Sequence, residues 1–379
     1  MASEFKRNLN TEHASFISRR GLFSRLRLDP ILMVLMFVLA GYGLVVLYSA
    51  SGNDSSRVVR QAVYLLIAFS AMLVIAQLSM KTVSALSPIA YGIGVLLLLA
   101  VVVIGVEVNG STRWLSIFGF IRFQPSELMK LAVPLTVAAY LARLPSPPKL
   151  GVLLVAVGLT LLPFGLVVVQ PDLGTSLLIV VSGLLVIWLA GLRWSVIFAG
   201  VSMALIAAWP AWTYLLKDYQ RQRILTMLDP EGDRLGAGWN IIQSKTAIGS
   251  GGWSGKGWQN GTQSQLNFLP ESHTDFIIAV LAEEFGLLGV LLLLGLYLLL
   301  ILRIAFIAVH AKDAFSRLVV GSLSLTFFVY VIVNMGMVSG ILPVVGVPLP
   351  LISYGGTAMV TMIASFGLIM AAHSEAQYR

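Results

Sequence analysis

Residues 275–302 read DFIIAVLAEEFGLLGVLLLLGLYLLLIL, and this stretch decides the class of fold. Apart from Asp275, Glu283 and Glu284, it contains only apolar, aromatic and glycine residues. A helix rises about 1.5 Å per residue, so a helical segment of this length exceeds the roughly 30 Å of hydrocarbon in a bilayer. The stretch therefore predicts a membrane-crossing helix that carries three acidic side chains.

The composition of the whole chain indicates the same class. Of its 379 residues, 58% are hydrophobic and only 11% are charged, and the mean hydropathy is +0.89. Soluble globular domains carry about 25% charged residues. The sequence therefore predicts an all-α, polytopic integral membrane protein. Because the chain has no cysteine, disulfides, thiolate metal sites and cysteine nucleophiles are excluded.

About ten segments have the length and apolar character of transmembrane helices. They lie near residues 31–50, 58–78, 84–106, 127–143, 150–169, 173–191, 195–216, 275–302, 317–340 and 352–372. We expect two parts, a basic cytoplasmic arm over residues 1–28 and a ten-helix membrane domain over residues 29–379. One long connection, residues 217–274, joins the seventh and eighth spans.

The distribution of Lys and Arg predicts the orientation, because short cytoplasmic loops are enriched in these residues. Six basic residues precede the first span: Lys6, Arg7, Arg19, Arg20, Arg25 and Arg27. With that arm inside, most other basic residues of the short loops also fall inside. Both termini are then cytoplasmic and the connection 217–274 is external. This arrangement accounts for the net charge of +8 without a nucleic-acid partner.

The external side carries most of the acidic residues and a proline-rich stretch, GILPVVGVPLPLISYGGT, at residues 340–357. Pro343, Pro348 and Pro350 prevent a regular helix there. Non-helical backbone at membrane depth persists only against protein or a water-filled cavity. We therefore expect a cavity that opens to the outside.

Three further features each allow a structural and a functional interpretation. Glu127 and Lys130 lie three residues apart on one helix face, as a structural ion pair or as part of a site, since ionisable residues at membrane depth often mark one. Asp172 is either favoured by a helix N-terminus or part of the same site. The glycine-rich segment 249–265 is either a flexible interfacial loop or a ligand-binding loop with Lys245 and Lys256.

The acidic residues of the opening stretch do not share one face. Asp275 can be a helix cap, with Ser272 three residues earlier. Glu283 and Glu284 lie about 80° and 180° round the helix from Asp275, and about 12 to 14 Å further along it. Buried acids need hydrogen bonds or opposite charges, so neighbouring helices must supply them. A polar cavity beside Asp275 is the functional alternative to the cap.

Several separated motifs closely resemble the SEDS family (shape, elongation, division and sporulation). The motifs are RFQPSELMKLAVP at 122–134, QPDLGTS at 170–176, DYQRQRILTMLDP at 218–230, the run 249–286 and the proline-rich stretch. The resemblance extends from about Leu28 to about Ala372 in the same order. The segment GTQSQLNFLPE, residues 261–271, resembles the sequences of the rod-elongation branch of the family.

The resemblance implies a peptidoglycan glycosyltransferase of the bacterial cytoplasmic membrane. Such proteins polymerise lipid II, a disaccharide-pentapeptide on undecaprenyl diphosphate, at the outer face of the membrane. They work with a class B penicillin-binding protein, which supplies transpeptidation, and with other membrane proteins of the elongation complex. A sugar 4-hydroxyl attacks the anomeric carbon of a second lipid-linked glycan and expels the diphosphate with inversion.

By the same resemblance, Asp275 is the general base. Candidate residues for the diphosphates are Lys130, Arg122, Arg221, Arg223 and Lys245. Glu127 and Asp172 would position these cations or the acceptor, and His273 and Thr274 would orient the site. No cofactor is certain, although a divalent cation is possible.

Two other functions stay open at this point. A lipid II flippase is the leading alternative, because a ten-span protein with intramembrane acids and an outward cavity could transport a lipid. The chain shows no inverted repeat, which transporters often have. A noncatalytic scaffold would leave the external acidic residues without a purpose.

Overall fold

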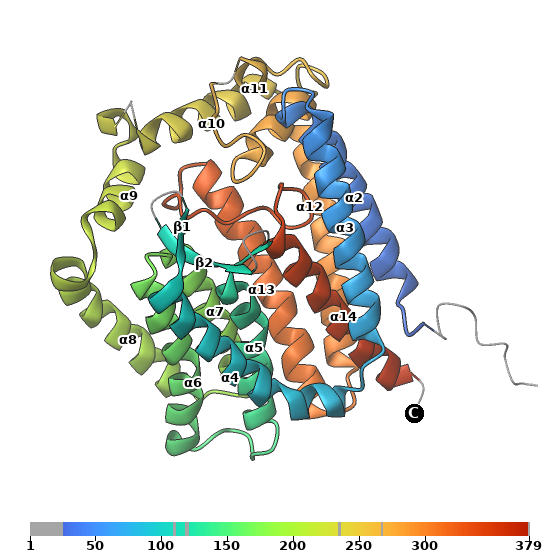
Figure 1. Ribbon diagram of the computed structural model, residues 1–379, viewed down its shortest axis with the longest axis vertical. Helices are drawn as coiled ribbons and strands as arrows, with labels where there is room; N and C mark the ends of the chain where they lie inside the picture. Colours follow the sequence, from blue (N-terminus) through green and yellow to red (C-terminus); the bar gives the residue numbers. More distant parts are fainter. Residues whose placement is uncertain (1–25, 109–110, 118–120, 234–235, 267, 378–379) are drawn as a thin grey trace, which may run out of the picture.

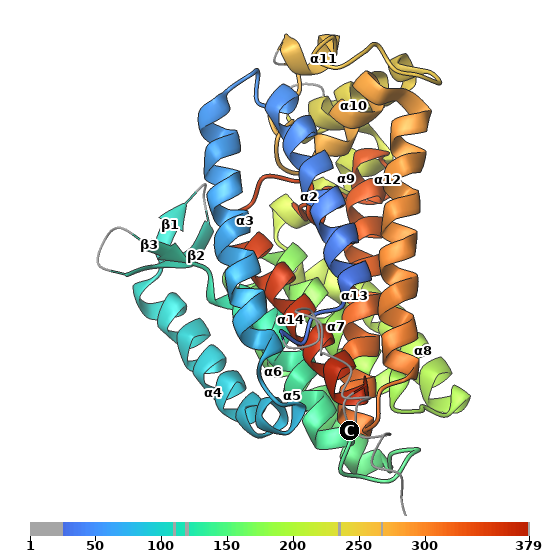
Figure 2. The same cartoon turned by 90° about the vertical axis from the view of Figure 1, so that its right-hand side faces the viewer.

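The computed structural model describes residues 26–108, 111–117, 121–233, 236–266 and 268–377. The side chains of residues 108, 111, 117, 121, 122, 215, 237, 264 and 265 are also outside the description. Most of the predicted arm 1–28 therefore lies outside it. The described chain is a helical bundle, shown from two sides in Figures 1 and 2.

Each predicted apolar span coincides with a helix. The first seven helices are α2 (Pro30–Ala50), α3 (Ser55–Ala76), α4 (Met80–Ile104), α5 (Pro125–Leu141), α6 (Leu150–Val169), α7 (Leu173–Leu189) and α8 (Trp194–Pro210). The last three are α12 (Ile277–Val309), α13 (Ala314–Val338) and α14 (Thr357–Gln377). Among the described residues, eight helices are long and apolar enough to cross a membrane by length and composition, and α7 is a shorter apolar helix.

The centre of the bundle is formed by α13 and α14. In the most apolar window of each helix, 61% and 67% of the residues are buried, against none in α8 and the turn that follows it. Helix α14 packs on α3, α5 and α13, whereas α8 makes its main contacts with the single π-helical turn Ala211–Leu215. Figure 1 shows α8 at the edge of the molecule. We therefore expect the functional polar side chains to lie around α13 and α14.

A small antiparallel sheet joins α4 to α5, which the sequence analysis does not predict. Its strands are β1 (Val106–Val108), β2 (Ser111–Ile117) and β3 (Ile121–Phe123), in that order across the sheet. Leu115 pairs with Phe123, and Trp114 with Val106. Apolar, aromatic and β-branched residues of this kind favour strands. In Figure 2 the sheet lies at one side of the molecule, beyond the end of α4.

The long connection 217–274 is largely helical where it is described. It contains α9 (Asp218–Leu228), a 3₁₀ turn (Pro230–Asp233), α10 (Ala237–Gly251) and the single turn α11 (Thr262–Gln265). These elements arch over one end of the bundle, while the described ends of the chain lie at the opposite end (Figures 1 and 2). Helix α10 packs mainly on α12.

Helix α12 is interrupted at Gly286, where φ is 64° and ψ is −162°. Segment 252–257 supplies partners for the backbone on both sides of the interruption. Lys256 N and Gly257 N donate to the carbonyls of Glu283 and Glu284, each at 3.0 Å. Leu287 N and Leu288 N donate back to Gly252 and Trp253 at 2.9 and 3.1 Å. A side chain at position 286 would collide with the backbone of Trp253 and Gly255, so only glycine fits.

The long connection also provides the partners of Glu283. This carboxylate is fully buried and accepts hydrogen bonds from Lys256 Nζ at 2.7 Å and from Thr262 N and Oγ1 at 2.9 Å. Gln263 N adds two longer bonds of 3.2 Å. Glu284 points elsewhere and accepts a hydrogen bond from Ser49 on α2. The prediction that the two acids face different partners is confirmed. For Glu283 these partners come from the long connection and not from a neighbouring membrane helix, so Glu283 attaches this connection to α12.

Candidate active site

The segment 271–276 is fixed through its backbone by three neighbouring parts of the chain. Asn334 of α13 donates to the carbonyl of Asp275 at 3.0 Å. Ser353 Oγ donates to the carbonyl of Thr274 at 2.6 Å, and Tyr354 N donates to that of His273 at 3.0 Å. Ser272 Oγ donates to Ala50 O at the end of α2. The side chains of this segment are thus held in place.

Asp275 does not cap a helix. Helix α12 begins at Ile277 with Phe276 at the N-cap position, and no side-chain hydrogen bond caps it. The cap interpretation is therefore wrong, because the chain turns for one more residue before the helix starts. The Asp275 carboxylate instead faces Gly346, a residue of the proline-rich segment with a φ of 74°.

The charge state of Asp275 is balanced by opposing neighbours. Burial raises the pKa of this carboxyl to about 6, and the negative charge of Glu271 adds to the rise. The positive charges of Arg113 on β2 and Arg223 on α9 lower the pKa of Asp275. A carboxyl with a pKa near 6 can accept a proton at neutral pH, as a general base must.

Arg113 is a member of this cluster that the sequence analysis did not select. Its NH1 lies 3.4 Å from Asp172 Oδ2, which also accepts a hydrogen bond from Gln124 Nε2 at 3.0 Å. The other oxygen of Asp172 caps α7 by accepting from Thr175 N at 3.1 Å. Asp172 therefore caps a helix, as one of its two interpretations predicts, and it also contacts Arg113. The signal in the sequence was that Arg113 lies in the connection between the third and fourth predicted spans, on the same predicted side of the membrane as QPDLGTS.

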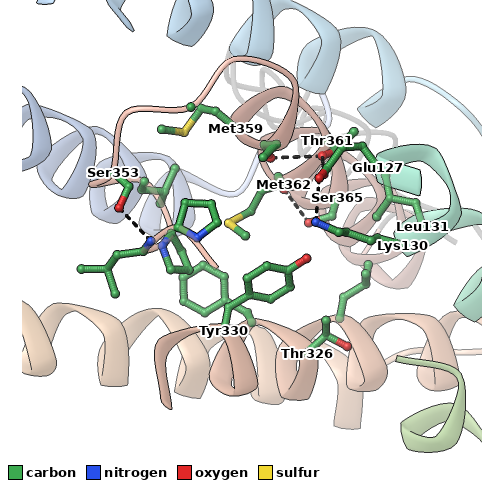
Figure 3. A pocket seen from close by; sticks show the side chains of 18 residues that line it. Glu127, Lys130, Leu131, Thr326, Tyr330, Ser353, Met359, Thr361, Met362 and Ser365 are labelled. Carbon is green, nitrogen blue, oxygen red and sulfur yellow. Dashed lines mark hydrogen bonds and ion pairs between the residues drawn. The ribbon is translucent and has the colours of Figure 1, made fainter. Parts of the chain in front are cut away.

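A pocket lies among α5, α13, α14 and the proline-rich segment, and Figure 3 shows its lining. Lys130 Nζ lies 2.7 Å from Glu127 Oε1, so the predicted ion pair is confirmed. Thr361 Oγ1 donates to the other oxygen of Glu127 at 3.0 Å. Lys130 Nζ is also 5.5 Å from the centre of the Tyr330 ring. Polar groups from three helices meet here, and apart from them the lining is mostly apolar.

The pocket and Asp275 lie next to each other but are not one cavity. Asp275 does not belong to the pocket lining. Ser353 connects the two, because it lines the pocket while its hydroxyl holds the carbonyl of Thr274. Pro348 and Pro350 also line the pocket, as the predicted cavity at the interrupted helix requires.

The remaining predicted cations lie in different places. Arg221 donates to Thr213 O at 2.9 Å and lies 3.7 Å from Asp218 on its own helix. Lys245 of α10 lies against Gly340, just after the end of α13. The side chain of Arg122 is outside the described part, although its backbone pairs with Ser116 in the sheet. Of the predicted cations, the structure thus associates Arg223 with Asp275 and Lys130 with Glu127.

His273 and Thr274 border the site on the side of α3. The His273 ring lies 6.1 Å from the Tyr354 ring, and burial and the charge of Arg57 lower the pKa of His273 while Glu271 raises it. Thr274 Oγ1 donates to Glu271 Oε2 at 2.6 Å. Thr274 thereby fixes the acid that affects the pKa of Asp275. Across the described residues, no group of three or more His, Cys, Asp or Glu side chains could hold a metal ion.

Comparison with known proteins gives consistent matches over almost the whole chain. The family model FTSW_RODA_SPOVE, described as cell cycle protein, matches residues 30–378. The chain is 50% identical over 360 residues to peptidoglycan glycosyltransferase MrdB of Escherichia coli K12, covering 94% of this chain and 96% of that protein. It is 30% identical to peptidoglycan glycosyltransferase RodA of Treponema pallidum, covering 92% and 98%.

Solved structures agree with these matches. A chain from a structure on the coordination of polymerisation and crosslinking by a peptidoglycan synthase complex has a TM-score of 0.81 and 32% identity, with 93% of this chain and 99% of that chain covered. The rod shape determining protein RodA of Thermus thermophilus has a TM-score of 0.69 and 30% identity, with 93% and 98% covered.

Proposed function

Because the chain belongs to the SEDS family of FtsW, RodA and SpoVE, we propose that it is a peptidoglycan glycosyltransferase that polymerises lipid II for rod-shape elongation. The observation that carries the proposal is the placement of Asp275. A partly buried carboxyl with a pKa of about 6, which the charges of two arginines lower, lies next to a mainly apolar pocket. This combination suits the transfer of a sugar from a lipid diphosphate.

The reaction is a single inverting displacement. The oxygen of the acceptor 4-hydroxyl forms a bond to the anomeric carbon of the donor, and the bond from that carbon to the diphosphate oxygen breaks. Asp275 accepts the hydroxyl proton as general base. The bonding electrons leave with the diphosphate, which needs nearby positive charge but no proton.

The cations at the site have distinct roles in this proposal. Arg113 and Arg223 are the positive charges that act on Asp275, so they are placed to stabilise the leaving diphosphate. Asp172, the N-cap residue of α7, contacts Arg113, and Gln124, the residue before α5, donates to Asp172. The pocket with Glu127 and Lys130 accommodates apolar parts of the substrate, because its lining is mostly apolar.

The partner and the working face follow from the same family relationship. One solved relative comes from a complex that coordinates polymerisation with crosslinking. We infer that a class B penicillin-binding protein supplies crosslinking to this chain, and that Asp275 acts on the external side of the bacterial cytoplasmic membrane. Co-purification of the two membrane proteins, with and without Asp275→Asn, tests whether the partner binds independently of catalysis.

The catalytic proposal is tested with purified protein and lipid II, with the partner present and absent. We expect wild-type protein to form glycan polymer and Asp275→Asn to form none above background. Asp218→Asn is the matched control, because Asp218 is an exposed carboxylate on α9 outside the site. Polymerisation by Asp275→Asn at the wild-type rate contradicts the role of the carboxylate.

The transporter alternative is tested with the same preparations in liposomes. Transbilayer movement of a fluorescent lipid II analogue that is equal for wild type and Asp275→Asn, without any polymer, would support the flippase instead. The glycosyltransferase proposal expects polymer from wild type and no change in lipid movement from the substitution.

A further inference from the structure

A second set of cations lies on α3, on the side of the molecule opposite α9 and its Arg223 (Figure 1). Arg57 and Arg60 are on the first two turns of α3, on the face that also carries Gln61 and Tyr64. Arg57 lies 3.5 Å from Asp54, with both side chains 39% exposed, and Arg60 donates to Ser56. Within the described contacts, the two guanidinium groups therefore interact only with Asp54 and Ser56, at the start of α3.

This face of α3 is linked to segment 271–276 through Ser353. The buried Gln61 side chain donates to Ser353 O at 3.1 Å and accepts from Gly355 N at 3.3 Å. Ser353 in turn holds the carbonyl of Thr274, the residue before Asp275. A ligand bound to the exposed part of this face is thus positioned relative to Asp275 by two consecutive hydrogen bonds.

Aromatic rings lie on the same face of α3 and next to it. Tyr64 and Tyr354 pack edge to face with their centroids 6.5 Å apart, and the His273 ring is 6.1 Å from Tyr354. All three side chains are partly exposed. Gly355 has open space around its Cα, so the backbone does not obstruct the surface. Aromatic faces with a few polar groups suit a sugar ring, and arginines suit a phosphate.

The two cation sets are distinct. The charges of Arg113 and Arg223 act on Asp275, whereas that of Arg57 acts on His273. Figure 1 shows α9, which carries Arg223, and α3, which carries Arg57, on opposite sides of the molecule. Segment 271–276 lies between them. It forms hydrogen bonds with α2 and α13 and contacts the loop at Ser353, which Gln61 binds.

The proposed reaction needs two lipid-linked glycans, and their diphosphates lie at different distances from the base. The donor diphosphate is attached to the carbon under attack. The acceptor diphosphate is separated from the attacking 4-hydroxyl by the length of its disaccharide. Arg113 and Arg223, near the Asp275 carboxylate, fit the first position, and Arg57 and Arg60, beyond His273, fit the second.

We propose that Arg57 and Arg60, with the rings of Tyr64, Tyr354 and His273, form the acceptor site and bind the diphosphate and sugar of the incoming lipid-linked disaccharide. This inference rests on the proposed function and assigns one of its two substrates. It predicts that the α3 arginines govern the acceptor and the Arg223 side governs the donor.

A coupling assay with two blocked substrates separates these roles. A lipid-linked disaccharide with a methylene in place of the anomeric oxygen has no leaving group and is acceptor only. A lipid-linked disaccharide that keeps its anomeric oxygen but has its 4-hydroxyl methylated is donor only. Wild-type protein should couple one of each. Arg57→Gln/Arg60→Gln should raise the KM for the acceptor by about tenfold to a hundredfold, as expected for lost charged hydrogen bonds, with the donor KM within about twofold.

Three controls make the result specific. Arg57→Lys/Arg60→Lys keeps the charge and should raise the acceptor KM less. Arg223→Gln should raise the donor KM instead. Arg193→Gln, an exposed arginine before α8, should change neither. Thermal unfolding in detergent shows whether each variant is folded. An Arg57→Gln/Arg60→Gln variant that raises both KM values equally, the donor value alone, or neither overturns the assignment.

Failure of the proposed function gives a different result. If wild-type protein couples nothing, with or without the partner, it is not a glycosyltransferase under these conditions. The acceptor inference is then judged by binding of the acceptor-only probe, compared with undecaprenyl diphosphate alone. Equal affinity of wild type and Arg57→Gln/Arg60→Gln for the probe overturns it, and preference for bare undecaprenyl diphosphate excludes the sugar contacts.

Discussion

The ionisation of Asp275 depends on a single acid and two cations at different positions in the sequence. Glu271 raises the pKa of Asp275, and Arg113 and Arg223 lower it, against a background of burial that raises it to about 6. A general base works only when deprotonated, so the rate should fall as the pH decreases below about 6. Changing one neighbour should move the acidic limb of the pH–rate profile in a direction set by the charge of that neighbour.

We therefore expect Glu271→Gln to shift the acidic limb of kcat/KM to lower pH, because removal of a negative charge stabilises the Asp275 carboxylate. Arg223→Gln should shift the limb to higher pH for the opposite reason. Rates measured from about pH 5 to 8 test both directions. Glu107→Gln, an exposed acid on β1, is the control. Identical limbs in all variants would assign the titration to another group.

Glu127 and Lys130 form a buried ion pair, and its removal can affect folding as well as activity. Loss of one partner leaves an unpaired charge, at a cost of roughly 3–5 kcal/mol. Glu127→Gln alone should therefore lower both the unfolding temperature and the yield of polymer. The double variant Glu127→Gln/Lys130→Met should recover the unfolding temperature but not polymerisation. Recovery of both the unfolding temperature and polymerisation would show that the pair has only a structural role.

At the scale of elements, the apolar helices were predictable and their polar connections were not. A run such as 150–169 needs no partner to be recognised, since its length and hydrophobicity suffice. The sheet of β1–β3 and the helices of the long connection depend on tertiary contacts. Segment 252–257 illustrates this, because its conformation is fixed by backbone groups of α12 more than 25 residues later.

The interruption of α12 gives a prediction with an internal control. Gly286→Ala introduces a side chain at φ 64° into backbone atoms of Trp253 and Gly255, so it should lower the unfolding temperature and loosen the long connection. Gly295→Ala lies in the same helix with nothing near its Cα, and should stabilise by up to about 1 kcal/mol. Thermal unfolding and limited proteolysis in detergent compare the two. Equal effects would mean that Gly286 is an ordinary helix residue.

At the scale of the whole molecule, the sequence motifs predict a candidate site but not the residues that surround it. Asp275, Glu127 and Lys130 belong to acidic or charged segments that stand out in an apolar chain. Tyr330 and Thr361 lie on α13 and α14, whose sequences contain many such polar residues. Only the packing of α5 against both helices shows which of them face Lys130 and Glu127.

The orientation in the membrane is open to a direct experiment, because the chain contains no cysteine. The long connection and the described chain ends lie at opposite ends of the bundle (Figure 2), so they should face opposite sides of the membrane. We predict that Ser254→Cys, between α10 and α11, reacts with a membrane-impermeant maleimide in cells with permeabilised outer envelopes. Lys312→Cys, between α12 and α13, should react only after the cytoplasmic membrane is disrupted. Both positions are exposed, so detergent-solubilised protein should label at both, and the reverse pattern in intact cells would place Asp275 on the cytoplasmic side.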